Sequence, residues 1–140
     1  MSSYPWKHVP GEAAPVPSRT QPVPPLDEDG LGGALADLAG FHAGIDMIRD
    51  GIRLLALDRL DREQTMNVLA ALAGTEQSIV TAIGYLVERL TNPDTNPALD
   101  TLDAETAKKV QTYGEGYRHE LTEDGPHQHA AEAVGLIDGI

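Results

Sequence analysis

Cysteine is absent from this 140-residue chain. Its absence excludes disulfide bonds, thiolate nucleophiles and cysteine-ligated zinc, and it is typical of proteins kept in a reducing compartment. The N-terminus also lacks an apolar run between a basic start and a cleavage site, so we expect no secretory signal. We therefore expect a cytoplasmic protein, or a component of a particle assembled in the cytoplasm.

Positive charge is scarce as well. Ten Lys and Arg residues stand against 22 Asp and Glu residues, which gives a formal net charge of −12. Such a surface repels phosphate backbones, which argues against direct nucleic-acid binding, and it attracts basic partners. The longest weakly charged stretch, residues 64–87, carries Glu76 and other polar residues near its middle, so we expect no membrane span.

The motifs of common enzyme classes are missing too. The sequence contains no Gly-x-Ser-x-Gly elbow, no phosphate-binding loop and no dinucleotide-type glycine pattern after a strand. The serines lie in the N-terminal leader or in the middle of a predicted helix, away from any base that could activate them. We therefore expect a protein that is not an enzyme.

Aromatic residues make up only 4% of the chain, and the one tryptophan lies in a proline-rich leader, residues 1–26. Seven of the ten prolines fall there, which favours an extended arm that is disordered in isolation. An aromatic anchor near its start and an Arg-x-x-Pro-x-x-Pro spacing near its end are typical of partner-binding segments. The alternatives are that the arm folds back on its own domain or has no role. The candidate binding residues are Tyr4, Trp6, His8, Arg19, Pro22 and Pro25.

Beyond the leader, apolar residues recur at helical spacing, and no alternating strand pattern occurs, so we predict an all-α fold. Asp61 with Gln64 three residues later forms a capping-box signature, and Pro93 and Pro97 end the helix that follows. The predicted helices cover about 33–56, 61–90, from 103 onward, and 127–137. The predicted organisation is an arm (1–26), a helical hairpin (27–91) and an acidic C-terminal helical segment (92–140).

Small residues recur every four positions in the first two predicted helices. If these helices form an antiparallel hairpin, the two series face one another and the backbones approach closely. The alternative is that they only reflect the composition of a high-GC bacterial genome. The residues of the predicted close seam are Ala36, Gly40, Gly44, Gly74, Ser78 and Ala82.

Bulky apolar residues flank that seam and form a face that the hairpin alone leaves partly uncovered. A second copy could cover it and complete a four-helix bundle, so we predict a homodimer or a higher oligomer. The predicted oligomer or core face consists of Phe41, Ile45, Ile48, Ile52, Leu72, Ile79, Ile83 and Leu86.

Two clusters combine histidine with carboxylates. In the hairpin register His42 lies opposite Glu76 with Asp46 one turn away; we favour a hydrogen-bonded His–Glu pair over a metal site there. The second cluster includes His119, His127 and His129 at a helix break, where such residues commonly act as caps. We predict no metal and no cofactor at either cluster.

These features favour a non-enzymatic interaction or assembly protein: an acidic, oligomeric helical hairpin whose arm docks on a neighbouring subunit or partner. A structural or adaptor role would fit, including one in a phage or another mobile element. One alternative is an acidic inhibitor or antitoxin-like protein that occupies a basic site. The other is a metal-dependent helical-bundle enzyme that uses His42, Asp46 and Glu76.

Overall fold

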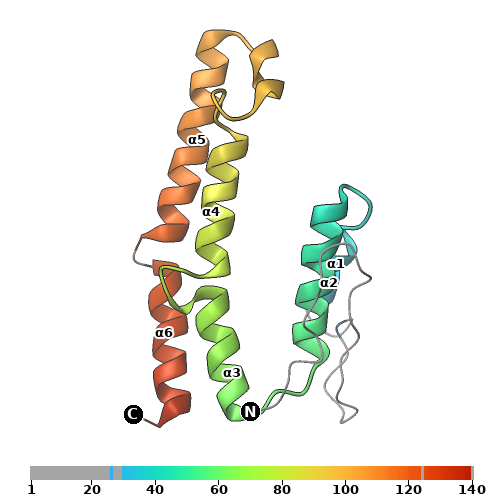
Figure 1. Cartoon of the computed structure of the whole chain (residues 1–140), viewed down its shortest axis with the longest axis vertical. Helices are drawn as coiled ribbons and strands as arrows, with labels where there is room; N and C mark the ends of the chain where they lie inside the picture. Colours follow the sequence, from blue (N-terminus) through green and yellow to red (C-terminus); the bar gives the residue numbers. More distant parts are fainter. Residues whose placement is uncertain (1–25, 27–29, 124, 140) are drawn as a thin grey trace. The chain divides into compact units, whose positions relative to one another are not determined.

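The computed structural model describes residues 26, 30–123 and 125–139. Every regular element in these residues is a helix, which confirms the predicted all-α class (Figure 1). The candidate binding residues of the arm lie outside the described residues. They are Tyr4, Trp6, His8, Arg19, Pro22 and Pro25.

The chain divides into two compact units, residues 1–60 and residues 61–140, which we call unit 1 and unit 2. In unit 1 the described helices are α1 (Gly30–Ala36) and α2 (Ala43–Leu57). The apolar residues of α2 recur every three or four positions, so they lie along one side of the helix.

A turn separates α1 from α2, so the predicted single helix over 33–56 is wrong. Gly40 has φ +87°, in the left-handed region that glycine adopts without strain. His42 then caps α2, because its Nδ1 accepts a hydrogen bond from the backbone N–H of Gly44 at 2.8 Å. The apolar pattern runs across this turn, and histidine is not among the usual N-cap residues, so periodicity alone missed the break.

Unit 2 begins with α3 (Arg62–Leu69), continues through the π-helical turn η2 (Ala70–Gly74) and enters α4 (Ile79–Leu90). The predicted capping box is confirmed: Asp61 Oδ1 accepts the Gln64 N–H at 2.8 Å, and Gln64 Oε1 accepts the Asp61 N–H at 3.0 Å. These reciprocal bonds satisfy two of the free amides at the start of α3.

The predicted unbroken helix over 61–90 is wrong, because the chain leaves helical geometry between Gly74 and Ile79. Ser78 starts α4 afresh, and its Oγ accepts the Thr81 N–H at 3.3 Å. A side chain that can cap a helix competes with the backbone bonds of a continuous one, and here the cap forms.

The second half of unit 2 contains a short 3-10 helix η3 (Pro97–Thr101), α5 (Ala104–Thr122) and α6 (Gly125–Asp138). Asp103 caps α5, since its Oδ1 accepts the Thr106 N–H at 2.8 Å. The start of the third predicted helix near 103 is thus confirmed, and α6 begins close to the predicted fourth helix.

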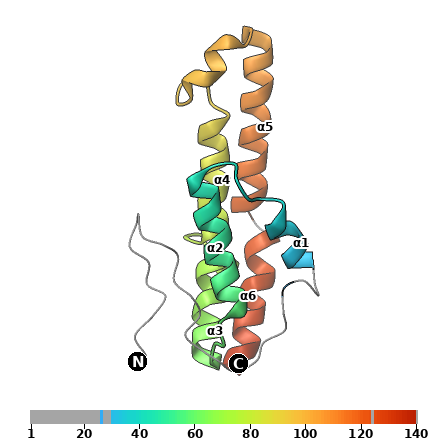
Figure 2. The same cartoon turned by 90° about the vertical axis from the view of Figure 1, so that its right-hand side faces the viewer.

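Within unit 2, α3 and α4 run in one direction and α5 and α6 return beside them (Figures 1 and 2). The contact between α4 and α5 is close because glycines stand in it. A Cβ placed on Gly114 would overlap Thr91 Oγ1, and one on Gly84 would lie 3.2 Å from Leu121 Cβ. Glycine at these two positions therefore allows the helix backbones to approach.

The predicted pairing of 33–56 with 61–90 would join the two units, and it stays a prediction. The predicted seam does not run along two unbroken helices, however. Gly40 lies in the turn before α2, Gly74 ends the π-helical turn, and Ser78 caps α4. The other seam residues, Ala36, Gly44 and Ala82, lie in α1, α2 and α4.

Candidate interaction surface

The side of α4 that meets α5 carries small and polar residues. Thr81 and Gly84 are buried, and Glu88 Oε2 accepts a hydrogen bond from Arg118 Nε on α5 at 3.0 Å. Just beyond α4, Thr91 Oγ1 donates to the backbone oxygen of Val87 at 2.8 Å. The helix therefore uses its less apolar side for packing inside unit 2.

The other side of α4 carries a stripe of large apolar residues, which we call the α4 stripe: Ile79, Ile83, Leu86 and Leu90. Their spacing of four, three and four residues places them along one line of the helix. Ile79, Leu86 and Leu90 remain 48%, 45% and 53% exposed. Contiguous exposed apolar surface of this kind is typical of interaction sites.

A groove of about 430 Å³ lies beside the α4 stripe. Its far wall is the turn after α4, which is held by hydrogen bonds to the last carbonyls of the helix. Thr95 Oγ1 donates to the Arg89 oxygen at 2.6 Å, and Asn96 Nδ2 donates to the Leu90 oxygen at 2.8 Å. We call this the α4 groove; its lining residues are Ala82, Tyr85, Leu86, Glu88, Arg89, Asn92 and Thr95.

A second groove of unit 2, of about 420 Å³, is more polar. Arg118 lines this groove, and its guanidinium lies 5.7 Å from the centre of the ring of Tyr85, which lines both grooves. Glu88 accepts a hydrogen bond from Arg118. That hydrogen bond raises the pKa of Arg118 above its ordinary value, so the side chain keeps its charge. The lining of this groove includes Ser78, Thr81 and Glu123.

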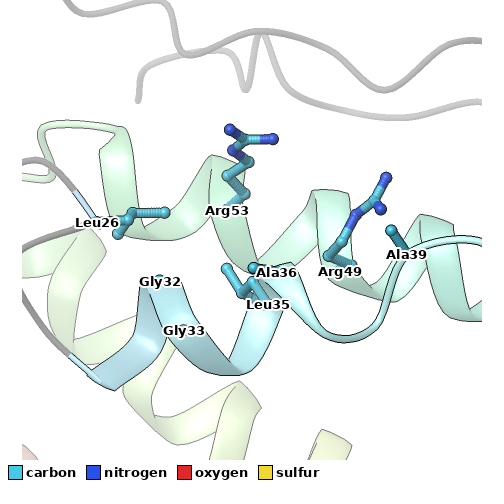
Figure 3. A pocket seen from close by; sticks show the side chains of 8 residues that line it. All are labelled: Leu26, Gly32, Gly33, Leu35, Ala36, Ala39, Arg49 and Arg53. Atoms are coloured by element: carbon cyan, nitrogen blue, oxygen red, sulfur yellow. The ribbon is translucent and has the colours of Figure 1, made fainter.

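Unit 1 has a pocket of about 520 Å³ formed by α1, α2 and Leu26 (Figure 3). Its floor consists of small and apolar residues of α1, and Arg49 and Arg53 extend from one side of α2. Arg49 forms ion pairs with Asp50 at 3.0 Å and with Asp46 at 3.7 Å. The two carboxylates offset the charge of Arg49 beside this pocket.

The predicted apolar face of α2 is also exposed in part. Phe41, Ile45 and Ile48 are exposed, and Ile52 is half-buried. In unit 2, Leu72 and Ile83 are half-buried, while Ile79 and Leu86 are exposed. A role of these residues in self-association stays a prediction.

In the first cluster of histidine and carboxylates, His42 and Asp46 have structural partners. His42 caps α2, and Asp46 Oδ1 accepts the Gly40 N–H at 3.2 Å. Glu76 is exposed in unit 2, between η2 and α4. Within the described ranges, no group of three or more His and carboxylate side chains could hold a metal ion.

The second cluster is spread over two helices. His119 Nδ1 lies 3.8 Å from Glu123 Oε1 on α5. His127, in the first turns of α6, is within hydrogen-bond distance of the Ala73 oxygen (3.3 Å) and the Thr122 oxygen (3.2 Å). Both partners are acceptors, so a neutral His127 donates to one of them at a time, and either bond links α6 to a neighbouring element, η2 or the end of α5. His129 is exposed.

No protein-family model, no curated protein and no solved structure matches this chain. Among the helices that the structure describes, none is long and apolar enough to cross a bilayer. The residues themselves therefore carry the functional argument.

Sequence reasoning found part of the α4 stripe but missed the α4 groove. Ile79, Ile83 and Leu86 follow from helical spacing, whereas Tyr85 lies off that spacing and Asn92 belongs to the turn. The glycine within the predicted third helix, Gly114, was the available signal for a close helix contact. Its partner Thr91 could not be inferred without knowing which helices pair.

Proposed function

We propose that this chain is a non-enzymatic interaction or assembly protein, an acidic oligomeric helical protein whose N-terminal arm docks on a neighbouring subunit or partner. The observation that carries the proposal is the α4 stripe. α4 packs its small and polar side against α5, and on its most apolar side Ile79, Leu86 and Leu90 remain about half exposed. Exposing large apolar residues is unfavourable in water, so a surface of this kind is typical of binding.

The use of the polar residues supports the same reading. His42 caps a helix, Glu88 pairs with Arg118, and His127 bonds to backbone oxygens. Side chains held in helix caps and in hydrogen bonds between helices stabilise a scaffold, and they are not arranged as a nucleophile with its base.

The composition of the arm supplies the second half of the proposal. Tyr4 and Trp6 flank Pro5, and large aromatic side chains of this kind supply much of the binding energy at protein interfaces. The proline-rich remainder favours extended chain, which loses less conformational freedom on binding than a flexible chain does.

Affinity capture from a lysate of the source cells tests the proposal. We expect Trp6→Ala and Leu86→Glu each to lose specific partners that the wild-type chain retains. Leu136→Glu is the matched control, because Leu136 is 77% exposed on α6, away from the α4 stripe. Far-ultraviolet circular dichroism checks that helicity is unchanged. Capture that is the same with and without Trp6 would refute the role of the arm.

An acidic inhibitor is the second candidate, and the exposed carboxylates of unit 2 favour it. Asp94, Asp100, Glu115 and Glu120 are all exposed, and acids outnumber Lys and Arg over 92–140. Such a protein would bind a basic site with an affinity that falls steeply as salt is added. Neutralising these four acids would then abolish capture, and Trp6→Ala would not.

A further inference from the structure

We propose that the α4 groove receives Trp6 from the arm of a second copy, so that two copies hold each other by exchanging arms. The inference rests on the proposed function, since it names the surface on which the arm docks. Four properties carry it: the chemistry of the groove, the distribution of charge, the size of the α4 stripe, and the length of the arm.

The α4 groove has the mixed character that an indole ring requires. Tyr85 and Leu86 give it an apolar wall and are about half exposed, at 54% and 45%. Asn92 and Thr95 place polar groups on the opposite rim. A tryptophan buries a large apolar body and needs an acceptor for its N–H, which this rim can supply. Arg89 also lines the groove, and a guanidinium stacks favourably on an indole face.

The distribution of charge favours docking of an arm over direct contact between the folded parts of two copies. The chain carries a formal net charge of −12, so two bodies placed face to face repel one another. The leader is the part with the opposite balance, with Lys7 and Arg19 against Glu12. Lys7 adjoins Trp6, and Asp94 is exposed on the turn that forms the groove rim. The basic arm is therefore attracted to the acidic folded part of a second copy, whereas two acidic folded parts repel one another.

The small area of the α4 stripe also favours an exchange of arms over a direct contact between two α4 helices. A 12-residue helix is about 18 Å long, and one stripe along it is small beside the roughly 800 Å² per partner of a stable interface. Two exchanged arms add four aromatic rings, each of which buries about 150–250 Å². Direct pairing of two α4 helices lacks this additional area.

The arm is long enough to reach a neighbour. Trp6 precedes Leu26 by 20 residues. At the rise of about 3.1 Å per residue of extended polyproline chain, 20 residues can reach up to about 60 Å. That reach is more than three times the length of α4, which is about 18 Å.

The test uses the full chain and its single tryptophan. Light scattering is expected to show a dimer at micromolar concentration, and dilution should shift Trp6 emission to the red as the dimer dissociates. Trp6→Ala and Leu86→Glu should each weaken self-association about 30-fold or more. For Trp6→Ala, this is the effect of losing an aromatic hot spot. Leu86→Ala provides a milder second variant in case the charge disturbs α4. Leu136→Glu should leave both readouts unchanged.

Several results would overturn arm exchange. They are a wild-type chain that stays monomeric, a tryptophan shielded in the monomer, and a dimer that survives Trp6→Ala. A dimer that is lost with Ile48→Glu but not with Trp6→Ala would assign self-association to α2 instead. If Trp6→Ala abolishes capture of another protein while the chain is monomeric, arm exchange and the oligomeric state fail, and docking of the arm on a different partner stands.

Discussion

Replacing Gly114 with alanine tests the packing of α4 against α5. Alanine favours helix over glycine by about 1 kcal/mol, so on propensity alone the substitution would stabilise α5. In this structure the new Cβ would overlap Thr91 Oγ1 and lie 2.6 Å from Thr91 Cβ. The two effects have opposite signs, and the distances decide which one dominates.

Rotating the Thr91 side chain cannot relieve the contact. Rotation moves Oγ1 and breaks its hydrogen bond to the Val87 oxygen, but it leaves Cβ in place. The helices must then separate by about 1 Å to restore an ordinary carbon–carbon distance of 3.5–4.0 Å. Overpacking of this kind costs about 1–3 kcal/mol, and the lost hydrogen bond costs about 1 kcal/mol. After the gain in helix propensity, we expect Gly114→Ala to destabilise the protein by about 2 kcal/mol.

Urea denaturation followed by far-ultraviolet circular dichroism measures this change. Gly116→Ala on the same helix is the matched control, because no atom lies within 4 Å of its added Cβ. We expect the control to raise the free energy of unfolding by about 0.5–1 kcal/mol. The reasoning is refuted if Gly114→Ala is as stable as Gly116→Ala, since the two helices would then not be in close contact there.

Two further predictions concern local hydrogen bonds. Hydrogen bonds from Thr106 lower the pKa of Asp103 below its ordinary value. The contribution of the carboxylate to the stability of α5 is therefore fully present above the ordinary pKa, and it is lost as the pH falls through the lowered pKa. Asp103→Asn, which keeps the cap without the charge, should flatten the acid dependence of helicity below about pH 4, and an unchanged acid transition would contradict this role. His127→Ala should speed amide hydrogen exchange in α6 by about 5-fold, the loss of about one hydrogen bond, with α4 unaffected. His129 is exposed on the same helix, so His129→Ala should have no effect. Equal effects of the two variants would contradict the role of the His127 hydrogen bond in holding α6.

Local signals predicted the helix starts well. Asp61 and Asp103 are ordinary capping residues, and both cap helices in the structure. The breaks were missed because apolar spacing continues across them, while His42 and Ser78 form local bonds that end one helix and start another. Hydrophobic periodicity reports which side of a helix is apolar, and it does not report whether the backbone stays helical at each residue.

The candidate surface was predicted in part for a similar reason. Spacing identified the apolar side of α4 through Ile79 and Leu86, which are exposed in the structure. The α4 groove also needs the turn that carries Asn92 and Thr95, and that turn is placed by bonds to the end of the helix. The contact at Gly114 depends on which helices pair, which is a tertiary property that no short stretch of sequence specifies.

The central claim is that this protein works by binding through its arm. Affinity capture with the full chain and with Trp6→Ala tests it most directly, when a lysate of the source cells and a tagged second copy are offered in parallel. The account predicts that the wild-type chain captures at least one of these neighbours and that Trp6→Ala loses it, while Leu136→Glu retains it. Equal capture by the wild-type chain and Trp6→Ala would contradict the account.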